Sequence, residues 1–395
     1  MKNSLDGLRL CGLLLCLVLS VQVVVGQQTA IADGKSARQL TSRDATQLAI
    51  KGRKLSAAEA VALEEKLAGD QQDLETRFTL IGYYSTRHDE SSSARKREQA
   101  LWLIQNIPDS ELLQHVAYAR LNQHERGFEE AKQLWLKQLD AYKGNLVVLS
   151  NAVDFFLLPD KALTEKLLKQ GAVADPSNAR WPQRLGQLYL LQMTYGDDTP
   201  RSQTAPASGQ HLREQPGRIT MSALQVDRER RTKMAEFASA QFELAYKLAK
   251  SDSERASLLV ELAKSAFEAG DVERAHRWAF ELLSQGTADK KDWNYGNAIH
   301  HGHIILGRIA LLSGSIAEAK QHLIEAGETP GSPQLNSFGP NMILAKELLE
   351  KGERESVIKY FELCASFWKN RTELDQWAAT VKGGGIPDFG ANLAY

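Results

Sequence analysis

Cysteine is scarce in this sequence, and neither sign of charge is in excess. Only 3 cysteines occur in 395 residues, and two of them, Cys11 and Cys16, lie in an apolar run at the N-terminus. A disulfide framework is therefore excluded, so a large apolar core must stabilise the chain. The formal net charge is −1, which provides no overall attraction to nucleic acid or to an anionic lipid surface.

Two further absences decide the fold class. No segment rich in Val, Ile or Thr alternates polar and apolar residues, and proline is rare inside the periodic segments. From Ser56 to Lys382 the apolar residues instead recur at every third or fourth position, which is typical of amphipathic helices. Ser56 and Glu59 have the spacing of a capping box, which opens a helix. The sequence therefore predicts an all-α domain over residues 55–382.

The N-terminus has the pattern of a secretory signal peptide. Lys2 and Arg9 precede or flank an apolar run over residues 10–26. Residues 1–26 are therefore predicted to direct Sec-type export to the periplasm or the extracellular space. Retention of the run as a membrane anchor is the alternative, although it is shorter than the about 20 residues that a spanning helix needs. The polar residues 27–54 are predicted to form a flexible lead-in.

One helical pair recurs in the second half of the chain. Residues 299–327 read as two short amphipathic helices joined by a turn at Gly314, with Gly307 and Ala319 where the helices would touch. The same pattern of small and apolar residues recurs 44 residues earlier and 38 residues later. Its turn glycine then falls at Gly270 and Gly352. The sequence therefore predicts stacked helix pairs with a common packing register.

This pattern resembles the tetratricopeptide repeat (TPR) family, whose 34-residue unit carries W-x2-L-G-x2-Y followed by A-x3-F. The best match is Leu185-Gly186-x2-Tyr189, with Trp181 one residue early. Its second helix is supplied by Ala238, Phe242 and Ala245, so the unit contains an inserted loop at about residues 194–225. The resemblance covers roughly residues 70–385, with repeat spacings that depart from 34.

The resemblance implies an α-solenoid of antiparallel helix hairpins, with a right-handed superhelical path that the unequal spacings make irregular. It also implies a concave groove, lined by the first helix of each pair, that binds a peptide or a protein without catalysis. One groove position, two residues after the repeat leucine, is occupied by Gln187, Lys264, Arg308 and Lys346. The position three residues further on is apolar in every unit, and it includes Phe267 and Leu311.

A cationic row beside an apolar row would suit an acidic or carboxylate-ended peptide. The alternative is that these cations are ordinary exposed helix residues, since Glu268 and Glu350 lie among them. We therefore predict an exported, non-catalytic scaffold for protein–protein interaction. A helical support domain for the assembly of cell-envelope carbohydrate or lipid is the second hypothesis.

No motif in the sequence supports catalysis or cofactor binding. Lys382-Gly-Gly-Gly385 lacks the Gly-Lys-Ser/Thr ending of a phosphate loop, so we interpret it as a helix end before a loose tail at 383–395, where Phe389 could dock on the last helices. His300, His301 and His303 have no third ligand at a helical spacing, so we expect neither a metal nor any other cofactor. Cys364 lies on an apolar stripe and is predicted to be a buried core residue.

Overall fold

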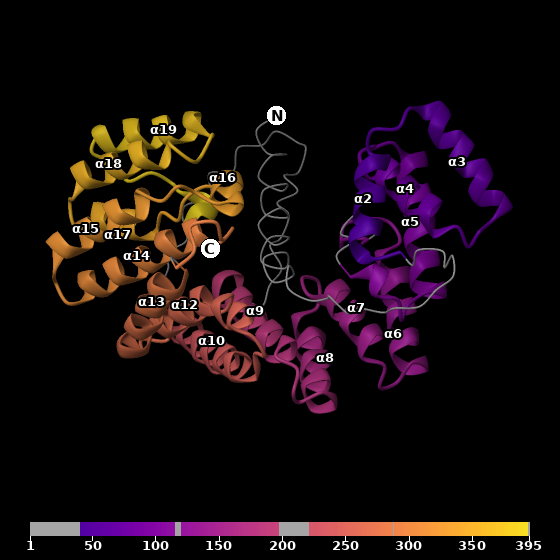
Figure 1. The fold of residues 1–395 in the computed structure, drawn as a ribbon, viewed down its shortest axis with the longest axis horizontal. Helices are drawn as coiled ribbons and strands as arrows, with labels where there is room; N and C mark the ends of the chain where they lie inside the picture. The colour runs from indigo at the N-terminus through magenta and orange to yellow at the C-terminus, as the bar shows by residue number, and fades with distance from the viewer. Residues whose placement is uncertain (1–39, 115–119, 197–220, 287, 394–395) are drawn as a thin grey trace. The chain divides into compact units, whose positions relative to one another are not determined.

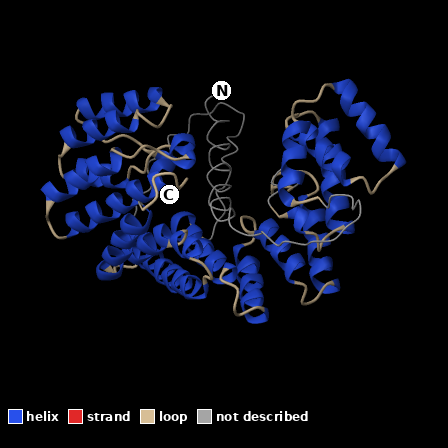
Figure 2. Cartoon of the chain, in the orientation of Figure 1, coloured by secondary structure: helices blue, strands red, loops and turns tan. Residues whose placement is uncertain are grey.

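The computed structural model describes residues 40–114, 120–196, 221–286 and 288–393. Within these ranges the regular elements are all helical, which confirms the all-α prediction (Figures 1 and 2). The described chain divides into two compact units, with the boundary between Ser177 and Asn178. The predicted signal peptide and most of the predicted inserted loop lie outside the described residues. None of the described helices is long and apolar enough to cross a membrane.

The N-terminal unit begins with a helix that the sequence analysis missed. Helix α2 (Ser42–Gly52) starts at a capping box between Thr41 and Asp44, so the prediction of a flexible lead-in is wrong for this part of residues 27–54. The helix is docked by small residues: a Cβ on Gly82 of the facing helix would come 1.8 Å from the Ala49 carbonyl oxygen. Because the two backbones approach so closely, the residues that α2 buries fully are small, namely Ala45, Ala49 and Gly52, while Leu48 packs partly buried against the same core.

Most of the other helices of this unit begin at side-chain caps, whereas the helix that starts at Phe128 follows Gly127 and has none. Ser56 and Glu59 form the predicted capping box at the start of α3. An Asp or Asn side chain accepts a backbone N–H at the start of four of the helices that follow. The elements after α2 are α3 (Ala57–Gly69), α4 (Leu74–Ser85), α5 (Glu90–Asn106), the 3₁₀ turn η1 (Glu111–Leu113), α6 (Phe128–Ala141), α7 (Leu146–Phe156) and α8 (Lys161–Ala174).

The C-terminal unit contains the repeated sequence. Its first two helices, α9 and α10, pack against each other across the inserted segment, and the Phe242 ring lies directly over Gly186. Thr194 and Tyr195, expected in the loop, belong to α9, and residues 221–225 belong to α10. The elements are α9 (Arg180–Tyr195), α10 (Met221–Leu248), α11 (Asp252–Ala256), α12 (Leu259–Glu268), α13 (Val272–Gly286), α14 (Tyr295–Leu312), α15 (Ile316–Gly327), α16 (Pro333–Phe338), α17 (Ile343–Glu350), α18 (Arg354–Cys364), α19 (Arg371–Lys382) and the 3₁₀ turn η3 (Gly390–Leu393).

The three predicted turns have the same structure. Gly270, Gly314 and Gly352 have φ angles of 80°, 83° and 88°, in the left-handed region that favours glycine. Each glycine N–H donates to the carbonyl three residues earlier, and the next N–H donates to the carbonyl five residues earlier. The second bond is the six-residue closure of a Schellman motif. The recurring glycine is therefore required by backbone conformation, because open space surrounds each of the three.

The predicted contact between Gly307 and Ala319 is also present. A Cβ on Gly307 would lie 3.4 Å from the Ala319 carbonyl oxygen, 3.1 Å from His322 Cβ and 2.4 Å from Leu344 Cδ2. Helix α14 is thus in close contact with its partner α15 and with α17 of the next pair. A larger residue here would have to displace two neighbouring helices.

We expect Gly307→Leu to lower the free energy of unfolding by about 1–3 kcal/mol through overpacking. Urea denaturation measures this loss. Ala317→Leu is the matched control, because Ala317 is exposed on α15 and should change stability by no more than about 0.5 kcal/mol. Equal stabilities for the two variants would contradict the close approach of α14 to α15.

The C-terminal segment is packed rather than loose. The predicted docking of Phe389 is confirmed, since its buried ring lies 5.0 Å from the Trp377 ring and 6.1 Å from the Phe361 ring. The Asn392 backbone carbonyl accepts a hydrogen bond from the Met342 N–H at 2.8 Å, which connects the segment to the loop before α17. Cys364 is buried beneath, as predicted. The prediction of a loose tail is therefore wrong for the described part of residues 383–393.

Candidate functional face of helices α12, α14 and α17

The predicted groove residues lie on four helices of the C-terminal unit. Gln187 is on α9, Lys264 and Phe267 are on α12, Arg308 and Leu311 are on α14, and Lys346 is on α17. All six are half-buried. Helix α14 contacts both α12 and α17, so the first helices of three successive pairs are neighbours.

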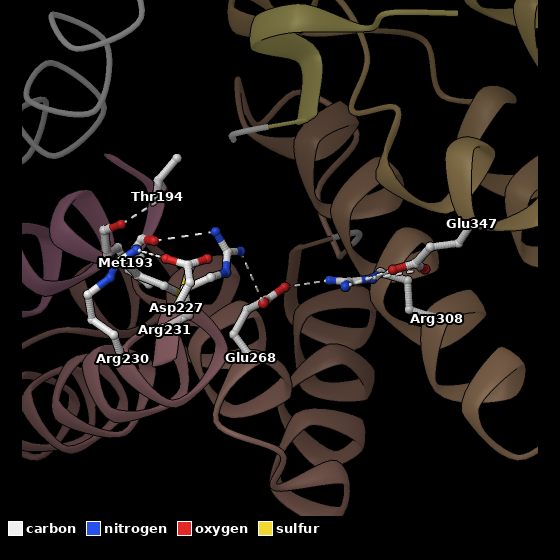
Figure 3. A network of polar contacts seen from close by, with 9 residues as sticks. Met193, Thr194, Asp227, Arg230, Arg231, Glu268, Arg308 and Glu347 are labelled. Carbon is white, nitrogen blue, oxygen red and sulfur yellow. Dashed lines mark hydrogen bonds and ion pairs between the residues drawn. The ribbon is translucent and has the colours of Figure 1, made fainter. Parts of the chain in front are cut away.

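Arg308 is the centre of this face. Its guanidinium carbon lies 4.1 Å from the centre of the Phe267 ring, so two residues predicted to form separate rows stack on each other. Arg308 Nη1 donates to Glu268 Oε1 at 2.7 Å. On the other side, Nε and Nη2 lie 2.9 and 2.8 Å from Glu347 Oε1 (Figure 3). Arg308 therefore links α12 to α17 through two ion pairs that are partly shielded from solvent.

The charges of this cluster depend on one another. Burial raises the pKa of Glu268, but the Arg308 guanidinium outweighs it and holds the pKa below its ordinary value. Burial also raises the pKa of Glu347, yet both of its oxygens accept from Arg308, so we treat it as ionised. The Arg308 side chain is 12% exposed. Each charge is thus stabilised by a partner from another helix, since bulk water is largely excluded.

The network continues toward α9 and α10. Arg231 Nη2 lies 3.9 Å from Glu268 Oε2, and Arg231 Nη1 donates to the Met193 carbonyl at 3.3 Å (Figure 3). Its neighbour Arg230 donates to the Gln192 carbonyl and to Asp227. The carbonyls at the C-terminal end of α9 are thereby capped by cations, which complements the negative end of a helix.

Two further ionisable groups on α12, Glu261 and Lys264, lie half-buried beside the network. Burial raises the pKa of Glu261 and lowers the pKa of Lys264. Glu261 Oε2 accepts no hydrogen bond from the described residues. Burial lowers the pKa of the His301 ring well below its usual range, and the nearby positive charge of Lys264 lowers it further. Buried ionisable groups of this kind concentrate at functional sites.

The predicted cationic row is not a row of isolated positive charges in the structure. Arg308 is compensated by Glu268, which the sequence analysis had noted, and by Glu347, which it had missed. Glu347 is the residue directly after Lys346, so it lies next to a predicted groove position in the sequence. Its partner is 39 residues away, and no local pattern identifies a contact over that separation. The face is consequently a mixed-charge network rather than a run of isolated cations.

The three histidines divide into different roles. His300 is fully buried, and its Nδ1 lies 3.0 Å from the Ala326 carbonyl oxygen, while its Nε2 accepts from the Asn341 N–H at 2.9 Å. These two bonds require a neutral ring with its proton on Nδ1. Burial accordingly lowers the pKa of His300 to about 4. His300 is therefore a structural residue that joins α14 to the loop before α17.

His303 lies in a separate polar cluster between α14 and α15. Its Nδ1 is 3.1 Å from His322 Nδ1 and 3.0 Å from Glu325 Oε2. The expectation that no third ligand accompanies the histidines is therefore wrong, because the facing helix provides a histidine and a carboxylate. His322 and Glu325 are three residues apart, a spacing that places both on one helix face and that is visible in the sequence. Their contact with His303 on α14 is not visible in the sequence. Burial lowers the pKa of His303, although Glu325 opposes the shift.

Comparison with known proteins adds no assignment to these two clusters. No model of a known protein family matches the chain, and no curated protein is similar enough in sequence to match it.

Proposed function

We propose that this chain is an exported, non-catalytic scaffold that binds a protein or peptide along the first helices of a TPR-like, irregular α-solenoid. The single observation that carries the proposal is the bridge from Glu268 through Arg308 to Glu347. It joins α12, α14 and α17 along one face. A row of first helices joined side by side is the surface that helical-repeat proteins present to extended partners.

The face combines features that suit an acidic peptide segment. Lys346 offers a cation on α17, and half-buried Phe267 and Leu311 offer apolar contact on α12 and α14. Arg308 is already paired, so its role in binding is to hold its neighbours in position. Specificity for an acidic partner would then depend on Lys346, because its cation lies beside the bridge and can attract a carboxylate of the partner.

We expect Lys346→Glu to weaken partner binding about tenfold, the equivalent of about 1.4 kcal/mol, without loss of stability. Lys359→Glu is the matched control, because Lys359 is an exposed lysine on the second helix of the same pair. A photo-crosslinking amino acid placed at either position in the native cells identifies the partner. Crosslinks to one defined protein from position 346, and not from 359, are the expected result.

Two outcomes would count against this assignment. Crosslinks from position 346 to envelope carbohydrate or lipid would favour the support-domain hypothesis instead. Equal crosslinking and equal affinity for the two lysine variants would show that the face has no special role in binding.

A further inference from the structure

The cluster between α14 and α15 has the donor set of a metal site. Two imidazole nitrogens and one carboxylate oxygen converge, with separations of 3.1 Å for His303 Nδ1–His322 Nδ1, 2.9 Å for His322 Nδ1–Glu325 Oε2 and 3.0 Å for His303 Nδ1–Glu325 Oε2. Within the described residues this is a group of three potential ligand atoms that lie close together. Donor atoms held about 2.0–2.1 Å from one ion stand about 2.9–3.4 Å apart, for right-angled to tetrahedral arrangements. The observed triangle falls in that range.

Hydrogen bonds alone satisfy this triangle poorly. A proton on one Nδ1 can point along only one edge, and a second proton on the other Nδ1 would place two donors 3.1 Å apart. A cation near the centre is attracted by all three donor atoms at once. The near-equal edges are therefore better explained by three ligands of one ion than by a pair of bent hydrogen bonds.

The surroundings hold the three donors in place. The Gln321 amide donates to Glu325 Oε1 at 2.9 Å, which leaves Oε2 directed toward the histidines. Hydrogen bonds of this kind to a ligating carboxylate are common outside the ligand shell of metal sites. Gly307 brings the helices close enough for His322 to reach His303, because a Cβ at that position would lie 3.1 Å from His322 Cβ.

We propose that His303, His322 and Glu325 bind a divalent first-row transition-metal ion. Imidazole ligands favour zinc, nickel, cobalt, iron and copper, whereas magnesium and calcium prefer an all-oxygen set. The side chains are 18–31% exposed, so an ion can enter from solvent. Three protein ligands also leave a coordination position for water or for a carboxylate of another molecule. The proposal concerns a cluster distinct from the Arg308 network and is independent of the proposed function.

The test uses the untagged full chain, stripped with a chelator and titrated with zinc chloride by calorimetry. We expect one zinc ion per chain, a higher melting temperature in the presence of zinc, and no response to magnesium chloride. Cobalt chloride serves as a spectroscopic probe, because the intensity of its visible absorption distinguishes tetrahedral from octahedral coordination. Absence of zinc binding to the correctly folded chain would overturn the proposal.

Variants locate the ion. Glu325→Gln keeps the shape of the side chain and His322→Ala shortens a partly exposed residue, so neither should prevent folding. Each is expected to weaken zinc binding more than 100-fold, and Gln321→Ala about tenfold. His276→Ala removes an exposed histidine from α13 and should leave the affinity unchanged. Zinc binding that is equally strong in His322→Ala and in His276→Ala would place the ion elsewhere and overturn the assignment.

Discussion

Arg308→Ala is expected to lower the free energy of unfolding by about 3–5 kcal/mol, the largest loss from any single change on the α12–α14–α17 face. The substitution leaves two carboxylates, Glu268 and Glu347, without their common partner, and their side chains are only 16% and 30% exposed. It also removes the guanidinium that covers the Phe267 ring. Urea denaturation followed by circular dichroism measures the loss.

Two controls separate the loss of charge pairing from the loss of an arginine. Arg277→Ala removes an exposed arginine on α13 and should cost no more than about 1 kcal/mol. Adding Glu268→Gln and Glu347→Gln to Arg308→Met should recover much of the stability, because the two carboxylates that Arg308 neutralised are then replaced by uncharged amides. A triple variant as unstable as Arg308→Ala would show that packing, and not the ion pairs, determines the loss.

Acidification is the second large expected effect. The pKa of His300 falls from an ordinary 6.5 to about 4 in the folded chain, so the unfolded chain binds more protons between these values. The contribution of His300 to the free energy of unfolding is therefore fully present above about pH 6.5 and is lost as the pH falls toward 4. The pKa difference corresponds to a contribution of about 3 kcal/mol from this residue. His301 has a pKa shifted in the same direction and adds to the decline.

The measurement compares unfolding free energies at pH 7, 5.5 and 4. His300→Phe should be less stable at pH 7, because the Ala326 carbonyl and the Asn341 N–H lose their partner. Its stability should, however, change less with pH than that of the native chain. His276→Ala, which removes an exposed histidine, should follow the native pH profile. An unchanged pH dependence in His300→Phe would rule out His300 as the responsible group.

Local rules account for the parts of the fold that the sequence predicted. The turn glycines were predictable because a left-handed φ restricts the residue type at one position, whatever surrounds it. The Ser56 capping box was predictable for the same reason, since its two bonds lie within four residues. Helix α2 was not predicted, because the residues that it buries are small, such as Ala45 and Ala49, and mark a helix only weakly in sequence.

The candidate sites depend on contacts that no local rule describes. The groove position of Arg308 was inferred from a resemblance, but its pairing with Glu268 and Glu347 joins residues 40 and 39 positions apart. His303 meets Glu325 only because Gly307 lets two helices touch. Predicting either site from sequence would require the register between helices, which is set by packing over the whole unit.

The three identical turns have a consequence for how this chain tolerates changes in length. The first helices end two residues before Gly270, Gly314 and Gly352, yet they contain 10, 18 and 8 residues. In these three pairs the variation therefore lies at the end remote from the turn, in segments such as residues 288–294 and 328–342, whereas the α9–α10 pair carries its inserted segment between its two helices. Insertions and deletions there leave the hydrogen bonds of the turn and the neighbouring groove positions unaltered. These three pairs can thus differ in length at one end while the glycine turn at the other end keeps one backbone conformation.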